Sequence, residues 1–246
     1  MEHNKNEGAG QLIKLIEGAY ASFFPREMHA MFRSRAETFS GRLSWEVTVR
    51  NGYERDRFDD LDPLYLVSVD PETEAYWGSL RLLPTTGPNM LRDVFPQLLE
   101  DGETVASSTI WESSRICAGS GPGQQRGRSG VNYVLTELIL GIGEVAVLAG
   151  LTEIVSVFDA RIFRVLKAAG CKLRIIGSPK TIGGVTCYAG LFAAGPGPLK
   201  AFRRRAGIES SILAPGALDW VSLCGETYLG RRFIAEERLP DCLVAD

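Results

Sequence analysis

This chain of 246 residues has few of the side chains that most often bind metals. It contains only two histidines, His3 and His29, and five cysteines at scattered spacings without a CxxC pair. With only two histidines, the sequence does not favour catalysis or metal binding by histidine side chains. Because the cysteine number is odd and the spacing irregular, we expect reduced thiols instead of a disulfide framework. The sequence predicts no metal site.

Long apolar runs and a strong excess of one charge are also missing. No apolar run approaches the roughly 20 residues that cross a bilayer. Residues 1–10 are polar, lack the apolar centre of a secretory signal, and are expected to form a flexible tail. The formal net charge of −3 gives no general attraction to nucleic acid or to anionic lipid. We therefore predict a cytoplasmic protein that binds neither nucleic acid nor membranes.

The remaining composition is that of a globular protein, with 45% hydrophobic and 23% charged residues. Strands dominate the first half, and strands alternate with helices in the second, which predicts a mixed central α/β sheet with helices on both faces. We divide the chain into a domain over 1–197 and a partly helical, loosely packed extension over 198–246. Apolar periodicity predicts helices over 11–24, 25–41, 93–99, 131–148 and 160–169, and strands over 45–49, 64–69, 76–84, 110–116, 152–158, 171–176 and 185–192.

Charged residues interrupt two of the apolar strands. Arg81 stands among leucines, and Glu112 and Arg115 interrupt the strand over 110–116. Burying such a charge without a partner is costly. Either a carboxylate elsewhere in the protein or an anionic ligand must therefore meet Arg81. A structural Glu–Arg pair between adjacent strands is the alternative explanation.

A second group of polar and aromatic residues precedes these strands. If its members line one pocket, they offer a guanidinium fork for a carboxylate, aromatic faces for a cation, and anionic oxygens. A ligand that matches this mixture carries both a carboxylate and a positive charge, as S-adenosylmethionine does. The acidic part lacks the glycine and terminal glutamate of an EF-hand loop. The members are Arg35, Phe39, Trp45, Glu54, Asp56 and Asp59.

A loop over 118–130, rich in glycine, glutamine and arginine, leads into the helix predicted from residue 131. Free N–H groups and the helix dipole favour an anion at such a position, so a phosphate cradle is one interpretation. A mobile surface loop is the other.

Together these residues form an ordered, correctly spaced series that closely resembles the acyl-homoserine lactone synthases, the autoinducer synthases of bacterial quorum sensing. The resemblance is strong over about 31–115 and continues faintly to about 195. It rests on Arg35-x-x-x-Phe39, Trp45, Glu54-x-Asp56-x-x-Asp59, Arg81 to Pro88, Met90-Leu91, Asp93-Val94-Phe95 and Trp111 to Arg115.

The resemblance implies a fold and a reaction. The fold is an N-acetyltransferase-like sandwich whose sheet has a V-shaped opening for a pantetheine arm. Members transfer an acyl chain from acyl carrier protein, or less often from coenzyme A, to the amine of S-adenosylmethionine. The acylated product then lactonises and releases methylthioadenosine. S-adenosylmethionine is a substrate here, so no cofactor is expected.

The resemblance also implies roles for residues. Glu112 would accept the amine proton, while Arg81 and Arg115 hold the reacting centre. Arg35, Phe39, Trp45, Asp56 and Asp59 would bind S-adenosylmethionine. The acyl pocket and donor side would use Phe95, Ser114, Ser156, Phe158, Arg126, Arg161 and Arg164. Arg161 and Arg164 would belong to a basic ridge that receives an acidic carrier protein; a solvated helix face is the plain alternative.

One departure bears on the acyl chain. Members that make 3-oxo products place threonines where this chain has Val155 to Phe158, with Ser156 as its one hydroxyl. An unsubstituted or 3-hydroxy chain is therefore favoured. Two rival functions stay open, namely a general CoA-dependent N-acetyltransferase and a sensor that binds S-adenosylmethionine without turnover.

Overall fold

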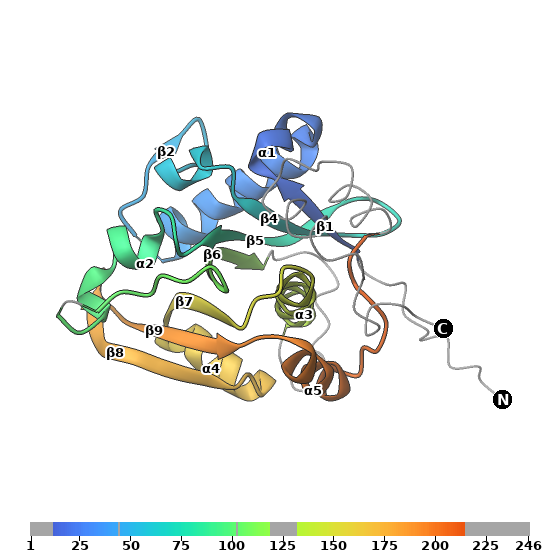
Figure 1. Ribbon diagram of the computed structural model, residues 1–246. Helices are drawn as coiled ribbons and strands as arrows, with labels where there is room; N and C mark the ends of the chain where they lie inside the picture. The colour runs from blue at the N-terminus through green and yellow to red at the C-terminus, as the bar shows by residue number, and fades with distance from the viewer. Residues whose placement is uncertain (1–11, 44, 102, 119–131, 215–246) are drawn as a thin grey trace.

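A mixed sheet of seven strands runs through the centre of the molecule (Figure 1). The computed structural model describes residues 12–43, 45–101, 103–118 and 132–214. Neighbouring strands are antiparallel except β6 and β7, which are parallel. In spatial order the strands are β1 (Leu12–Glu17), β4 (Leu64–Val69), β5 (Tyr76–Pro84), β6 (Ile110–Ala118), β7 (Glu153–Asp159), β9 (Val185–Ala193) and β8 (Leu173–Ile182).

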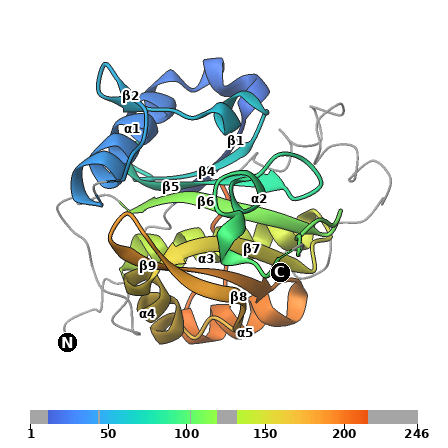
Figure 2. The ribbon, with the colours of Figure 1, turned by 90° about the vertical axis from the view of Figure 1, so that its left-hand side faces the viewer.

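Helices cover both faces of this sheet (Figures 1 and 2), which confirms the predicted mixed α/β sandwich. Within the described ranges, no helix has both the length and the apolar character that crossing a membrane requires. One face carries α1 (Pro25–Arg35), its π-helical continuation η2 (Ala36–Arg42), α2 (Met90–Asp93) and the hairpin β2 (Val49–Arg50) to β3 (Tyr53–Glu54). The other face carries α3 (Tyr133–Leu148), α4 (Ala160–Ala169) and α5 (Pro196–Ala206). Three 3-10 turns complete the fold, η1 (Gly18–Phe23), η3 (Arg57–Asp60) and η4 (Pro96–Leu98).

Strand β4 shows how the sheet separates two hydrophobic cores. All six of its residues are buried. Leu64 and Leu66 pack into the core that contains α3, whereas Tyr65 and Val67 pack against α1. Because both faces of the sheet are covered, the strand is a continuous apolar run. This explains why strand 64–69 could be predicted from its content.

The helix predicted over 11–24 is wrong. Residues 12–17 form strand β1, which pairs antiparallel with β4, and η1 follows. Ile13 and Leu15 enter one core and Ile16 enters the other. A strand that is apolar on both faces can produce the spacing of an amphipathic helix, so periodicity alone chose the wrong element.

Two further predicted elements are displaced. Only Val49 of the strand predicted over 45–49 is in a strand, because Trp45 N–H instead donates to Phe39 O at 2.8 Å and closes the end of η2. The helix predicted over 93–99 is wrong, because α2 begins at Met90, where Asn89 caps it by accepting from Arg92 N–H, and ends at Asp93, and the 3-10 turn η4 follows over Pro96–Leu98. Helix α4 follows the prediction at both ends.

The chain after Pro198 is packed more firmly than predicted, as far as the structure describes it. Helix α5 begins at Pro196, and Leu199, Ile212 and Leu213 belong to the core beneath α3. Ile13 N–H donates to Ile212 O at 2.8 Å, so residues 212–214 lie alongside β1.

The hairpin of β8 and β9 is fixed against η4 by a glycine. Gly177 lies at a bulge in β8 with a φ of +58°, and a Cβ there would lie 1.9 Å from Leu98 O. A nearby glycine, Gly184, has a φ of +79° but open space around the position of its Cβ.

We expect Gly177→Ala to lower the free energy of unfolding by at least about 2 kcal/mol, since it combines a left-handed backbone with a clash against the Leu98 carbonyl. Gly184→Ala is the matched control, and we expect about 1 kcal/mol from its backbone strain alone. Urea unfolding of both variants measures the difference. Equal losses would show that the hairpin does not depend on close approach at Leu98.

Candidate active site

A cavity opens where β6 and β7 separate. Their parallel pairing runs from Ile110 to Ser113 on β6 and ends at Ser156 on β7, although both strands continue. The space beyond this point is a cavity of about 570 Å³, which we call the outer cavity. It is walled by η2, β6, β7 and α4, and its volume suits a small-molecule ligand. This separation is the V-shaped opening that the resemblance implied.

A bulge in β6 places Arg115 on the wall of this cavity. Ser79 pairs with Cys117 and Arg81 with Ser114, so Arg115 and Ile116 together face the single residue Leu80. Arg115 has a φ of +55°, a left-handed conformation that costs on the order of 1–3 kcal/mol for a non-glycine residue. Its guanidinium compensates by donating to Glu54 Oε1 at 2.9 Å and lying 2.8 Å from Asp56 Oδ2.

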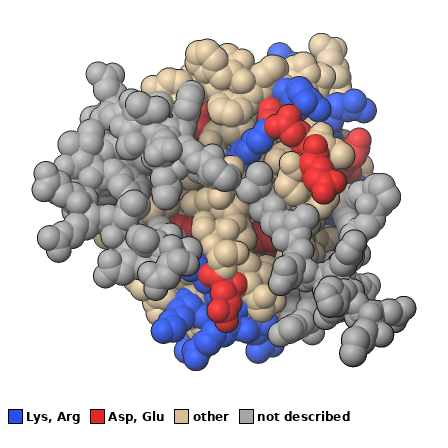
Figure 3. Space-filling model, turned by 90° about the vertical axis from the view of Figure 1, so that its right-hand side faces the viewer, with Lys and Arg blue, Asp and Glu red and all other residues tan. Residues whose placement is uncertain are grey.

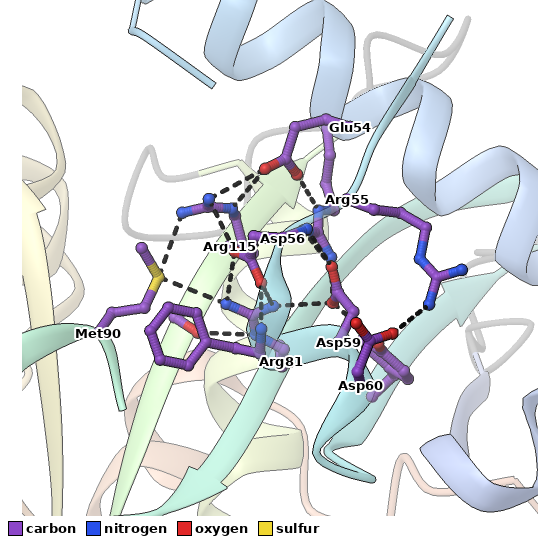
Figure 4. A network of polar contacts seen from close by, with 12 residues as sticks. Glu54, Arg55, Asp56, Asp59, Asp60, Arg81, Met90 and Arg115 are labelled. Carbon is purple, nitrogen blue, oxygen red and sulfur yellow. Dashed lines mark hydrogen bonds and ion pairs between the residues drawn. The ribbon is translucent and has the colours of Figure 1, made fainter. Parts of the chain in front are cut away.

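Arg115 belongs to a buried arginine–carboxylate network of three guanidinium and three carboxylate groups (Figure 4). Arg35 donates from Nε to Glu54 at 2.5 Å and from both terminal nitrogens to Asp59 at 2.8 and 2.9 Å. Its forked geometry thus binds a carboxylate of the protein itself. The equal numbers leave the network formally neutral.

Arg81 connects the same network to β5. Its Nη1 donates to Asp56 at 2.6 Å and to Asp59 at 2.8 Å, and its Nε donates to Ser114 Oγ. The partner that the sequence required for Arg81 is therefore a pair of carboxylates in the turn over 54–59. Met90 Sδ contacts both Arg81 and Arg115 (Figure 4).

Asp59 accepts more hydrogen bonds than the other two carboxylates of this network. Burial alone would raise the pKa of Asp59, but the cations of Arg35 and Arg81 hold it well below its ordinary value. Tyr65 Oη also donates to Asp59 Oδ1 at 2.9 Å. The ionised form is therefore strongly favoured in the folded protein.

Glu112 does not take part in a Glu–Arg pair of the kind considered from the sequence. Its two oxygens accept from the backbone N–H groups of Met90, at 2.9 Å, and Leu91, at 2.6 Å, so it holds the first turn of α2. Burial raises the pKa of Glu112, although these N–H donors and the nearby arginines oppose the shift. Glu112 is one of the residues that line the outer cavity.

The predicted site residues fall into two sets. Arg35, Asp56, Asp59 and Arg81 belong to the network and are not among the residues that line the outer cavity. The others that the structure describes line the outer cavity. Phe39 and Trp45 lie 5.7 Å apart, and Phe95 lies 6.3 Å from Trp45, measured between ring centroids. The lining set is Phe39, Trp45, Phe95, Glu112, Ser114, Arg115, Ser156, Phe158, Arg161 and Arg164. Arg126 lies outside the described residues.

Sequence reasoning missed Thr38, Arg42 and Met90, which also line the outer cavity. Arg42 follows Phe39 by three residues on η2, so helical spacing from Phe39 could have indicated it, whereas Thr38 is adjacent to Phe39 and is not indicated in this way. Met90 belongs to the series that carries the resemblance, but no role was assigned to it, because its sulfur contacts arginines that are distant in sequence.

A second, mostly apolar cavity of about 340 Å³ adjoins the first, and we call it the inner chamber. It lies among α3, α4, α5 and the strands β6, β7 and β9. Ser156 and Phe158 line both cavities. The Ser156 hydroxyl donates to Ser113 O at 2.7 Å, so it is already engaged by the protein.

We expect Asp59→Asn to lower the free energy of unfolding by at least about 3 kcal/mol at pH 7, because it leaves buried arginine charge uncompensated. Since its folded pKa is depressed, Asp59 stabilises the fold above its unfolded pKa of about 4, and this contribution is lost as pH falls further. The deficit of the variant should therefore shrink below about pH 4 in urea unfolding.

Asp60→Asn is the neighbouring control. Asp60 pairs with Arg55 on the surface, so we expect a change within about 0.5 kcal/mol and little dependence on pH. Similar losses for the two variants would contradict the role of Asp59 as the centre of the network.

Three comparisons agree with this geometry. A family model described as autoinducer synthase matches residues 23–198. The acyl-homoserine-lactone synthase of Agrobacterium fabrum is 40% identical over 175 residues, which cover 71% of this chain and 81% of that protein. The AHL synthase LasI has a similar structure, with a TM-score of 0.69 and 26% identity over 79% of this chain and 95% of LasI.

A further structure shares the fold. It is the structure of BjaI, a CoA-dependent acyl-homoserine lactone synthase, with SAM and isopentyl-CoA. The TM-score is 0.72 and the sequence identity 23%, and the match covers 87% of this chain and 100% of the BjaI chain. Taken with the matched model and the 40% identical relative, the chain belongs to the autoinducer synthase family and is an acyltransferase, an acyl-homoserine-lactone synthase.

Proposed function

We propose that the outer cavity binds S-adenosylmethionine beside the thioester of an acyl donor, and that the acyl chain enters the inner chamber. The observation that carries this proposal is the position of Glu112 and Arg115 on the wall of the outer cavity, directly next to an apolar chamber. The SAM and isopentyl-CoA of BjaI support the same pair of substrates.

The aromatic and basic residues that line the cavity suit the sulfonium and the carboxylate of S-adenosylmethionine. The faces of Phe39 and Trp45 can stabilise the sulfonium by cation–π attraction. Arg42, exposed at the end of η2, can meet the methionyl carboxylate. Arg35 and Asp59 then act as positioning residues, because they fix the turn over 54–59 that holds Arg115.

The first chemical step joins the amine to the acyl group. The α-amine, with a pKa of about 8, must lose a proton before its nitrogen attacks the thioester carbonyl. A C–N bond forms, the C–S bond breaks, and the donor thiol leaves. Glu112 accepts the amine proton directly or through water, and its raised pKa makes it a better base than a solvated carboxylate.

The second step closes the lactone. A carboxylate oxygen attacks the γ-carbon next to the sulfonium, the C–S bond breaks, and methylthioadenosine leaves. The sulfonium is already a good leaving group, so this step needs positioning more than proton transfer. No cofactor is required for either step.

Acyl carrier protein is the donor we propose. Arg161 and Arg164 lie one turn apart on α4, line the outer cavity and are accessible, so they can attract an acidic carrier while its pantetheine arm enters. Acyl-CoA is the rival donor, because its arm is the same and BjaI is CoA-dependent.

The first test is a reaction of purified protein with S-adenosylmethionine and matched carrier-protein and CoA thioesters, followed by mass spectrometry. We expect acyl-homoserine lactone and methylthioadenosine in equal amounts, with carrier-protein thioesters preferred. Faster turnover with CoA thioesters would reject the proposed donor. An acylated amine without lactone would indicate a general N-acyltransferase, and binding without either product would indicate a sensor.

We expect Glu112→Gln to lower the rate of acylation by at least about 100-fold, because the variant cannot accept a proton. The same variant should lactonise synthetic acylated S-adenosylmethionine at a near-normal rate, which separates loss of a base from damage to α2. Single-turnover kinetics measure both steps. Equal loss of the two steps would assign Glu112 to structure alone.

A further inference from the structure

Helix α5 forms one wall of the inner chamber, although the sequence suggested no role for it. Leu199, Phe202 and Arg205 line the chamber from this helix, opposite α3 and α4. Leu199 approaches α3 where that helix has no side chain, since a Cβ at Gly143 would lie 3.0 Å from Leu199 Cδ1. The depth of the chamber therefore depends on where α5 is held.

A buried carboxylate holds α5 against α3. Glu144 of α3 accepts from Arg203 Nη2 at 2.8 Å, from Ser211 Oγ at 2.6 Å and from Ile212 N–H at 3.2 Å. These contacts connect α3 with α5 and with the segment that follows it. Because Glu144 is fully buried, replacing its carboxylate would remove this ion pair with Arg203 from a poorly solvated place.

A second contact holds α5 against α4. Arg205 Nη2 donates to Ala168 O at 2.9 Å, and its guanidinium lies over Gly170, where a Cβ would come within 2.5 Å of Nε. A cation is favoured at this carboxyl end of α4. Basic side chains gather at the lower edge of the face on which α5 lies (Figure 3). In the run 203–205, Arg203 is half-buried and bonds Glu144, whereas Arg204 and Arg205 are both exposed and Arg205 makes its contact with α4 at the surface.

We infer that α5 sets the length of the acyl chain, with Leu199 and Phe202 meeting its end and with Glu144 and Arg205 as the residues that position this wall. The occupant is an aliphatic chain, because the chamber is mostly apolar and the Ser156 hydroxyl already donates to Ser113 O. This inference rests on the proposed function, since it names what limits the substrate of the same site.

The test is a competition among carrier-protein thioesters of graded chain length, with products resolved by mass spectrometry. Phe202→Ala should shift the preferred donor to longer chains, with a gain in relative kcat/KM of about four-fold for each methylene that enters the new space. Phe202→Leu should give a smaller shift in the same direction. Arg204→Ala is the matched control and should leave the profile unchanged.

Glu144→Gln tests the positioning of the wall without changing its lining. We expect a broader chain-length profile with an unchanged KM for S-adenosylmethionine, because only the α5 side of the site moves. If both Phe202 variants and Glu144→Gln make lactone with the profile of the unaltered protein, the inference is wrong and the proposed function stands. If the unaltered protein makes no lactone, the proposed function itself fails.

Discussion

The site depends on the hydrogen-bonded ion pairs that Arg35 and Arg81 form with Asp59. They join α1, the turn over 54–59 and β5 at one buried point, and Glu54 and Asp56 extend the network to Arg115 on β6. Buried ion pairs contribute little net stability when compared with apolar packing, but they are specific, because breaking one pair leaves an uncompensated charge. This network connects α1, the turn over 54–59, β5 and β6 through charged contacts.

The network and the separation of strands β6 and β7 have different roles in the site. The network presents one cation, Arg115, from a strained bulge. The separation of β6 from β7 leaves room in front of it, and Glu112 lies at the boundary with its carboxylate held by the first turn of α2. A rigid, neutral frame therefore supports a cavity whose few charged groups face the ligand.

Much of this arrangement could be predicted from the sequence, because charges inside apolar strands are costly and demand an explanation. Arg81 and Glu112 were recognised in this way. Which group each charge meets could not be predicted, since a linear pattern does not say which face of a helix meets which turn. Arg35 looked like a fork for a ligand, yet it binds Asp59. The prediction for residues 12–17 was wrong because a strand that is buried on both faces has the apolar spacing of a helix. The wall formed by Phe202 could not be predicted because it depends on contacts between segments that are distant in sequence.

The long separations within the network bear on the order in which the protein can fold. Arg115 follows its partner Glu54 by 61 residues, and Arg81 follows Asp56 by 25. Contacts this far apart in sequence form slowly, because the intervening chain must be ordered first. During synthesis Arg35, the three carboxylates of the network and Arg81 all emerge before β6, which carries the third guanidinium, Arg115. The charge balance of the site is completed only when β6 joins the sheet, which couples assembly of the cavity to formation of the central strands.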